Sequence, residues 1–376
     1  MKIGIDIRPL MQSHYSGVSE YTYQLLNHLF ELDPHNEYLL FYNAHKDLEK
    51  NLPRFNFPNV TFKGFNLPNK LLNLSFLIFR YPKIDRLLGG IDILFLPNIN
   101  FSASSTNTKL VIMVHDLSFE RHPEFFDLKH KLWHTLRGAK ELIGDANHLL
   151  AASKSTKRDV HELYNVSEEI ITVTYEGLDP QFIDFKYDET KATAIQEKYN
   201  LPEKYILYLG TLEPRKNVTS IIEALDNIPL DYHLVLAGRM GWKYDNILKA
   251  AGARKDRVVF LDYVDKEDKP YLYNSATLFV WPSYYEGFGL PPLEAQASGT
   301  PVVVGANSSL VEVIGNSGLL VNVDNVNEIS QAINAIINDE QLRNSLIKKG
   351  FENSKRFRWK QTAQKTVEVF NSILNT

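Results

Sequence analysis

Two adjacent cations, Arg215 and Lys216, stand where they could hold an anion. They belong to Gly210-Thr211-Leu212-Glu213-Pro214-Arg215-Lys216-Asn217, which directly follows the apolar run 205–209. Asn217 is of a type that caps helices, and an apolar helical pattern begins at Val218. Cations are disfavoured at the positive end of a helix, so two of them there indicate a bound anion held together with backbone amides. A solvated basic turn is the simpler interpretation, but the position after a buried strand favours anion binding.

Two glutamates bracket a loop rich in glycine, proline and aromatic residues. Glu286 and Glu294 are separated by Gly-Phe-Gly-Leu-Pro-Pro-Leu, directly after the apolar run 278–281 and a short aromatic turn. Glycine permits close approach of a ligand to the backbone, and Pro291 suits the first turn of a helix. The amides that open this helix are candidates for binding phosphate. Two glutamates at this spacing are a weak signal alone, since a loop charge and an exposed helix residue would look the same.

A histidine ends a strand in the first half of the chain. His115-Asp116 follows the apolar run 110–114. A lone histidine at the end of a strand is more often structural than catalytic, and Asp116 would point to the other side of a continuing strand, so its role is open.

Strands and helices alternate along nearly the whole chain. Apolar runs predict strands at 2–7, 38–42, 93–96, 110–115, 148–152 and 171–175, and again at 205–209, 233–237, 258–261, 278–281, 301–304 and 319–323. Continuous apolar runs are typical of strands buried on both faces of a parallel sheet. Alternation with amphipathic helices predicts two doubly wound α/β halves, divided near the polar stretch 184–193, and ligands in such sheets bind beyond the carboxyl ends of strands.

Composition excludes several classes of function. The 376 residues carry 41 Lys and Arg against 45 Asp and Glu, so no global basic field for nucleic acid exists. The absence of cysteine excludes disulfides and thiol chemistry. No apolar stretch reaches the roughly 20 residues that span a bilayer. We therefore expect a cytoplasmic protein without a nucleic-acid partner.

In the loops that contain Arg215, Lys216, Glu286 and Glu294, the chain resembles the retaining glycosyltransferases of family 4. The run from Glu286 to Glu294 looks like the family's signature of two glutamates seven residues apart, and Gly210–Asn217 is similar to its donor-diphosphate loop. Ser298–Val303, Asn307–Glu312 and Gly318-Leu319-Leu320 are also similar to family motifs, and the helix at Phe357-Arg358-Trp359 resembles its closing helix. The resemblance implies the GT-B fold: an acceptor-side Rossmann-like domain (1–187) and a nucleotide-sugar-binding one (188–355) facing a central cleft, with a C-terminal helix (356–376) crossing back to the first.

The resemblance also implies roles for residues of the second half. Glu286 would contact hydroxyls of the donor sugar, Glu294 the ribose, and Arg215 with Lys216 the departing diphosphate. The remaining expected donor contacts in this half are Thr211, Val264 at the nucleobase, and the amides near Phe288, Gly289 and Leu290. Thr211 stands where many relatives have an arginine, which places more of the diphosphate binding on the two cations.

In the first half the resemblance implies two further contacts. His115 would lie near the reacting carbon of the sugar, and Gly17 would approach the donor phosphates. Gly17 is preceded by Ser16, whereas a pair of glycines is common at this point in the family, so the chain departs here from the family pattern.

The expected activity is retaining transfer of a hexose in polysaccharide biosynthesis. The resemblance favours mannose carried on GDP, with a UDP-sugar as the alternative, and a glycan or lipid-linked glycan as acceptor; it leaves front-face attack and a covalent intermediate both open. No cofactor is expected. No Asp-x-Asp clamp for a metal-bound diphosphate occurs, so we expect metal-independent transfer.

Four rival functions share this type of fold. A nicotinamide dehydrogenase would need a Gly-x-Gly-x-x-Gly turn after a first strand, which neither half contains. A nucleotide-sugar epimerase or a phosphorylase of the same fold, and a catalytically silent binding protein, remain as alternatives. The apolar segment Lys70–Arg80 favours a buried helix, with peripheral docking at the inner face of the membrane as the other possibility.

Overall fold

The computed structural model resolves the chain into two compact units. It describes all residues except 13–15, 45–51, 130, 132–135, 137 and 375–376. The first unit comprises 1–119, 128–177 and 358–376, and the second comprises 120–127 and 178–357. The chain thus contributes 120–127 to the second unit, passes to it again after Gly177 and returns after Phe357, so the boundary expected between 187 and 188 falls inside the second unit.

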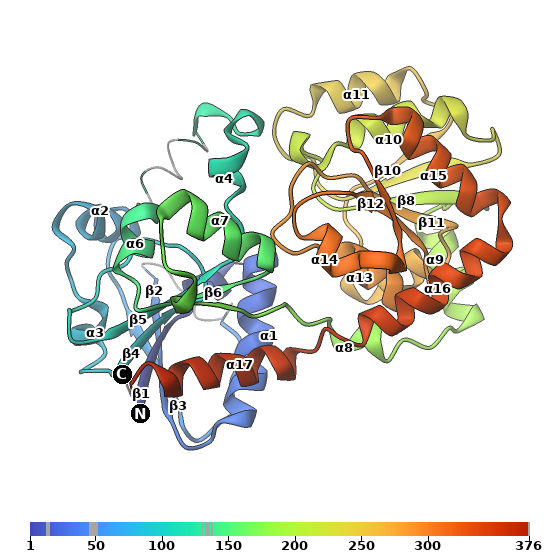
Figure 1. Cartoon of the computed structure of the whole chain (residues 1–376). Helices are drawn as coiled ribbons and strands as arrows, with labels where there is room; N and C mark the ends of the chain where they lie inside the picture. Colours follow the sequence, from blue (N-terminus) through green and yellow to red (C-terminus); the bar gives the residue numbers. More distant parts are fainter. Residues whose placement is uncertain (13–15, 45–51, 130, 132–135, 137, 375–376) are drawn as a thin grey trace. The chain divides into compact units, whose positions relative to one another are not determined.

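The described part of the first unit is built on a seven-stranded parallel sheet (Figure 1). Its strand order is β3-β2-β1-β4-β5-β6-β7. The strands are β1 (Lys2–Asp6), β2 (Glu37–Asn43), β3 (Val60–Phe65), β4 (Ile93–Leu96), β5 (Lys109–Val114), β6 (His148–Ala151) and β7 (Ile171–Val173). The helices are η1 (Arg8–Met11), α1 (Gly17–Leu32), α2 (Asn69–Phe79), α3 (Ile84–Leu87), α6 (Ala139–Asp145), α7 (Lys154–Tyr164), η4 (Glu168–Ile170) and α17 (Trp359–Ser372). Helix α4 (Ser118–Arg121) spans the point where the chain first passes to the second unit.

The described part of the second unit repeats the plan with a six-stranded parallel sheet of order β10-β9-β8-β11-β12-β13. The strands are β8 (Tyr205–Leu209), β9 (His233–Ala237), β10 (Val258–Leu261), β11 (Leu278–Trp281), β12 (Val302–Gly305) and β13 (Leu319–Val321). The helices are η3 (Pro123–Phe125), α8 (Pro180–Ile183), α9 (Glu189–Lys198), η5 (Pro214–Lys216), α10 (Val218–Ala224), η6 (Leu225–Asn227), α11 (Asp245–Gly252), η7 (Lys266–Asp268), α12 (Lys269–Asn274), α13 (Leu290–Ala297), α14 (Leu310–Ile314), η8 (Gly315–Ser317), α15 (Val326–Asn338) and α16 (Glu340–Ser354).

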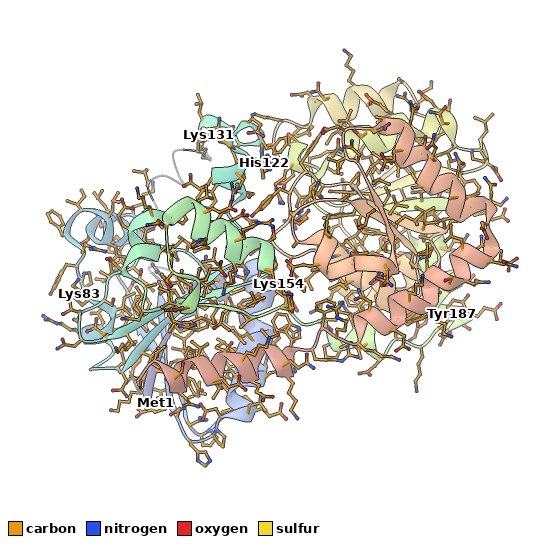
Figure 2. The ribbon with its side chains drawn as sticks, in the orientation of Figure 1. Met1, Lys83, His122, Lys131, Lys154 and Tyr187 are labelled. Carbon is orange, nitrogen blue, oxygen red and sulfur yellow. The ribbon has the colours of Figure 1, made fainter. Side chains whose placement is uncertain are left out.

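Burial explains why these runs form strands. Every residue of β4, β6, β8, β11 and β12 is buried, as expected of parallel strands covered on both faces, and side chains fill the space around each sheet (Figure 2). Helix α1 begins where the Ser16 hydroxyl accepts the amide of Ser19, and its apolar stripe is buried, including Tyr21, Leu25 and Leu29. The prediction of two doubly wound α/β halves is confirmed.

The C-terminal helix packs on the first unit. Helix α17 lies beside α1 (Figure 1), and its Thr362 hydroxyl donates to the carbonyl of Tyr175 at 2.6 Å. A Cβ atom on Gly177 would come within 2.3 Å of the Trp359 amide nitrogen. A side chain at position 177 is therefore incompatible with this close approach.

The structure differs from the sequence-based expectations in two local features. Strand β3 was not predicted, because this edge strand pairs only with β2, is largely half-buried or exposed, and contains Lys63 and Gly64. Asn217 stands before α10 but does not cap it by accepting a backbone amide. Its backbone is left-handed, with φ of 55°, and its side chain instead donates to Val323 O and accepts from the Ser220 hydroxyl.

Within the described residues, no helix is both long enough and apolar enough to cross a membrane.

Candidate active site

Two neighbouring strands bring the predicted donor loops together. Strands β8 and β11 pair in parallel, so the loop after Leu209 and the loop after Trp281 leave the same edge of the sheet side by side. The amide of Tyr284 donates to the carbonyl of Arg215 at 2.9 Å, which ties the second loop to the first. Residues distant in sequence thus form one site in the second unit.

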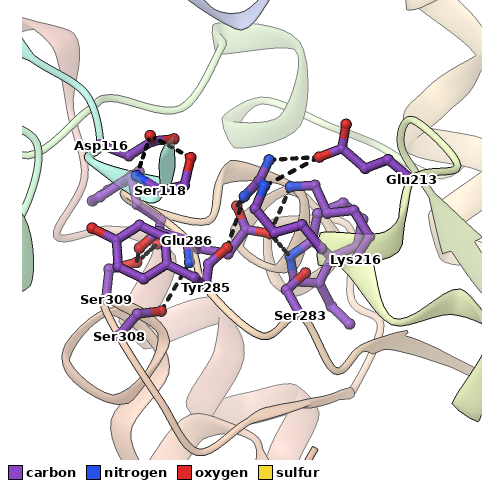
Figure 3. A network of polar contacts seen from close by, with 12 residues as sticks. Asp116, Ser118, Glu213, Lys216, Ser283, Tyr285, Glu286, Ser308 and Ser309 are labelled. Atoms are coloured by element: carbon purple, nitrogen blue, oxygen red, sulfur yellow. Dashed lines mark hydrogen bonds and ion pairs between the residues drawn. The ribbon is translucent and has the colours of Figure 1, made fainter. Parts of the chain in front are cut away.

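Lys216 and Glu286 form a buried ion pair at this edge. Lys216 Nζ lies 2.6 Å from Glu286 Oε1, and the two residues are only 8% and 7% exposed (Figure 3). Trp281 Nε1 donates to the same oxygen at 2.9 Å, and Lys216 Nζ lies 4.6 Å from the Trp281 ring centroid. The loop glutamate is therefore a fixed anion rather than a solvated surface charge.

Arg215 bridges this pair to a second carboxylate. Its Nη1 donates to Tyr285 O at 2.7 Å and lies 3.3 Å from Glu286 Oε2. Its Nη2 and Nε donate to Glu213 Oε1 at 2.8 and 3.1 Å (Figure 3). Both predicted diphosphate cations are thus held by carboxylates, and the charges of Glu213, Arg215, Lys216 and Glu286 balance.

The environment keeps Glu286 ionised. Burial acts to raise the pKa of Glu286, but the charges of Lys216 and Arg215 outweigh it and lower the pKa to about 2. Burial, followed by the charge of Arg215, lowers the pKa of Lys216 from its usual range, against the opposing pull of Glu286 and Glu213. Glu286 consequently acts as a hydrogen-bond acceptor at neutral pH.

Serine side chains fix the backbone of the glutamate loop. The Ser308 hydroxyl accepts the Glu286 amide at 2.9 Å. The Ser309 hydroxyl reaches the carbonyls of Glu286 and Phe288 at 2.9 and 2.7 Å. The loop is therefore preorganised by the segment that follows β12.

Helix α13 offers fewer free amides than the sequence suggested. It begins after Gly289, whose φ of 109° favours glycine, and its second and third residues are Pro291 and Pro292. Proline has no amide hydrogen, so Leu290 and Leu293 are the remaining donors among the first four helical residues. One turn further, Glu294 is half-buried and its Oε2 accepts from Tyr273 Oη at 2.9 Å.

The other predicted donor residues take no part in these ion pairs. Phe288 is buried with its ring edge-on to Phe357 at 5.5 Å, and Val264 is buried just after β10. Thr211 is exposed, and its carbonyl accepts from Tyr208 Oη at 2.8 Å. The structure therefore brings Arg215, Lys216 and Glu286 into contact, whereas Thr211 stands at the start of the Arg215 loop and Val264 follows β10, which β9 separates from β8.

A segment from the first half of the sequence also supports the glutamate loop. Residues 120–127 belong to the second unit, where the ring of Phe125 stacks on Tyr284 at 5.0 Å and His122 lies 5.6 Å from Tyr285. Trp242 Nε1 donates to the carbonyl of Phe125 at 2.8 Å. Sequence reasoning missed this contact, because nothing in a short run of histidine and phenylalanine indicates which unit it joins.

In the first unit, both ring nitrogens of His115 face acceptors. Nε2 lies 2.8 Å from Pro97 O, and Nδ1 lies 3.2 Å from Oε1 of the buried Glu176. A carbonyl oxygen only accepts, so the contact with Pro97 has Nε2–H as its donor, while Nδ1 faces the carboxylate of Glu176. The edge of Tyr21 packs on the imidazole at 4.6 Å. Glu176 therefore fixes the ring of His115, and sequence reasoning missed it because only the fold brings β5 and the segment after β7 together.

A small cavity opens beside His115. It measures about 140 Å³ and is lined by Val18, Asn98, Ile99, His115, Asp116, Phe119 and Ala139. Asn98, one of the lining residues, has its Oδ1 buried without a hydrogen-bond partner among the described residues. Asp116, whose role was open, accepts the amide and hydroxyl of Ser118 and so begins α4. Gly17 is exposed at the first residue of α1, with open space around its Cα.

The described residues contain no group of three or more His, Asp or Glu side chains arranged to hold a metal ion.

Comparison with known proteins identifies the family. Residues 15–182 match the family model described as Glycosyltransferase Family 4, and residues 191–353 match that described as Glycosyl transferases group 1. O-antigen chain mannosyltransferase B of Escherichia coli is 32% identical over 281 residues, which cover 73% of this chain and 73% of that protein. The serotype-specific mannosyltransferase WbdA of Escherichia coli is 30% identical over 239 residues, which cover 61% of this chain but 29% of WbdA.

A solved structure shares the fold over the full length. Sucrose-phosphate synthase from Thermosynechococcus elongatus superposes with a TM-score of 0.78 at 21% identity, covering 100% of this chain and 99% of that one. At this identity the likeness establishes the fold alone. Together with the matches in both halves, it confirms the resemblance seen in the sequence: the chain is a GT-B protein that belongs to glycosyltransferase family 4.

Proposed function

We propose that the protein transfers mannose from GDP-mannose, or less favourably another sugar from a UDP donor, to a hydroxyl of a glycan or lipid-linked glycan, with retention and without a metal. The observation that carries the proposal is the buried cluster of Lys216, Arg215 and Glu286 where β8 and β11 end. The preference for mannose rests on the similarity to two mannosyltransferases of Escherichia coli.

The charge of the cluster suits the departure of a diphosphate. When the bond between the sugar carbon and the phosphate oxygen breaks, negative charge develops on the diphosphate and positive charge on the carbon. Preorganised cations in a dry site stabilise the first of these charges without reorganisation. In the free protein, Lys216 and Arg215 are already paired with carboxylates. A bound diphosphate would therefore share these cations with Glu213 and Glu286.

Glu286 suits a contact with sugar hydroxyls. Its Oε1 is engaged by Lys216 and Trp281, whereas Oε2 meets Arg215 at 3.3 Å. Each carboxylate oxygen accepts about two hydrogen bonds, so Oε2 retains capacity for a hydroxyl donor. An ionised carboxylate there also stabilises positive charge on the sugar ring as it develops.

The other residues of the site are assigned contacts with the ribose, the rest of the nucleotide and the sugar. Glu294, one turn into α13, would accept hydroxyls of the ribose, with Tyr273 holding its other side. Val264, Phe288, Gly289, Leu290 and Thr211 would line the nucleotide, and Gly17 and His115 would contribute from the first unit. We propose that the Glu176 carboxylate holds the His115 ring in its orientation beside the sugar.

A panel of nucleotide-sugars tests the proposal. Thermal unfolding measured with each donor should show stabilisation with GDP-mannose, worth about 2.7 kcal/mol at a concentration of 100 times Kd. Release of nucleoside diphosphate should then depend on a glycan acceptor. Release that requires inorganic phosphate would indicate a phosphorylase, epimerised donor an epimerase, and stabilisation without turnover on any acceptor a binding protein.

A further inference from the structure

Helix α2 is anchored to the first unit by one face only. Leu72 and Phe76 are 4% and 3% exposed and belong to the core beside Phe41. The Arg8 guanidinium lies 5.7 Å from the Phe76 ring centroid. The prediction of a buried helix therefore holds for the face of α2 that carries Leu72 and Phe76. Because this face is packed on the core, the opposite face of α2 points away from it.

The opposite side of α2 is apolar and exposed. Leu71, Leu74 and Ile78 follow a helical spacing of three and four, and they are 63%, 49% and 59% exposed. The C-terminal end continues this surface with Phe79 and Tyr81, which are 73% and 60% exposed. Scattered exposed apolar residues are ordinary, but a run of large ones on a single short element marks an interaction surface.

Basic residues flank this apolar face along the chain, with Lys70 on α2 itself and Arg80 at its C-terminal cap. Residues 60–86 carry five cations, Lys63, Lys70, Arg80, Lys83 and Arg86, and one acid, Asp85, although the chain as a whole has a net charge of −4. Asp85 is buried and accepts the amide of Ser105, so it adds little negative charge to the surface. Arg80 pairs with Asp145, but its side chain remains 56% exposed. Lys83 lies on the same side of the unit as α2 (Figures 1 and 2).

We propose that this surface, formed by Leu71, Leu74, Ile78, Phe79 and Tyr81 with its basic rim, docks on an anionic lipid bilayer. The 11 residues of α2 span roughly 16 Å, about half of the hydrocarbon thickness, so the helix lies in the plane of the interface. Apolar side chains enter the boundary between headgroups and acyl chains, while the lysines meet anionic headgroups. A contact with a second copy would use the same patch on both chains and bring two basic rims together, which disfavours that occupant.

Vesicle flotation of the full-length protein tests the proposal. The vesicles are phosphatidylcholine alone and phosphatidylcholine mixed with phosphatidylglycerol, both free of sugar substrates. We expect flotation with the anionic vesicles, weaker flotation with the neutral ones, and a loss of this difference in about 1 M salt, where the screening length falls to about 3 Å. Because no substrate is present, the outcome does not depend on the proposed function.

Matched variants separate the apolar and the charged contributions. I78S/F79S should weaken binding to anionic vesicles at least tenfold, whereas L230S, which alters an 82% exposed leucine of the second unit, should bind as the wild type does. K70Q/K83Q should weaken binding roughly fivefold per lysine, and K348Q/K349Q on α16 should not. Circular dichroism and thermal unfolding verify that each variant folds.

Three results would overturn the proposal. The first is a wild-type protein that stays at the bottom of the gradient with anionic vesicles, and the second is an I78S/F79S variant that floats as well as the wild type. The third is a dimer in sedimentation velocity without vesicles that I78S/F79S converts to a monomer, which would assign the face to a second copy of the chain.

Discussion

Replacing Glu286 by glutamine removes one charge from the buried cluster and leaves its shape nearly unchanged. The carboxylate is more stable in the folded protein than in the unfolded chain, because its pKa falls from 4.5 to about 2. Each pKa unit corresponds to about 1.4 kcal/mol, so ionisation of Glu286 stabilises the fold by about 3 kcal/mol at neutral pH. E286Q forfeits this contribution and leaves the Lys216 ammonium facing a neutral acceptor instead of a carboxylate.

The contribution of Glu286 to the free energy of unfolding should decrease as the pH falls. A depressed folded pKa contributes stability that is fully present well above the unfolded pKa of 4.5 and is lost as pH falls toward about 2. Urea unfolding should therefore show the wild type about 3 kcal/mol more stable than E286Q at pH 7, with the difference falling to roughly half by pH 3. E203Q, which changes an exposed glutamate of the same unit, should stay within about 0.5 kcal/mol of the wild type.

Activity should fall together with stability. A hydrogen bond to a charged group contributes about 1.5–3 kcal/mol, so E286Q should lower kcat by roughly ten- to a hundredfold if the contact strengthens in the transition state. Its affinity for free nucleoside diphosphate should be maintained or improved, because a carboxylate that competes for Lys216 is gone. A stability difference below about 1 kcal/mol, or one that does not change with pH, would refute the electrostatic reasoning.

Three further outcomes are expected. Glu294→Ala should weaken nucleotide affinity by about ten- to a hundredfold, measured by calorimetry, and leave kcat at saturating donor within a few-fold of the wild type; an unchanged Kd would remove Glu294 from the ribose site. Glu176→Ala should lower kcat and leave nucleotide affinity unchanged, because the His115 ring loses the partner that faces Nδ1, whereas an unchanged kcat would make Glu176 merely structural. Transfer should persist in excess chelator, and complete loss that magnesium or manganese restores would contradict reliance on Lys216 and Arg215.

The buried strands and the loops that follow them could be predicted because their signals are local. Continuous apolar runs such as Tyr205–Leu209 and Leu278–Trp281 are buried throughout, and the carboxyl ends of adjacent parallel strands must lie together. Strand β3 lacks this signal, since an edge strand with alternating exposure and a glycine resembles a loop.

Pairings across the fold could not be predicted, because spacing along the chain does not encode them. The contact of Glu176 with His115 joins residues 61 apart, and that of Glu286 with Lys216 joins residues 70 apart. The sequence indicated that Lys216 and Glu286 serve the same donor, but it did not indicate that they neutralise each other. Likewise, Pro291 and Pro292 indicate the start of α13, but each also removes an amide hydrogen from its first turn.

The anomeric configuration of the product tests the central claim most directly. The protein is incubated with GDP-α-mannose and a mannose-terminated oligosaccharide, and the anomeric proton signals are followed by NMR as the reaction proceeds. Retaining transfer predicts that an α-mannosyl linkage appears first, in step with the release of GDP. A β-linked product, or no product and no GDP release with any donor and acceptor of the panel, would contradict the account.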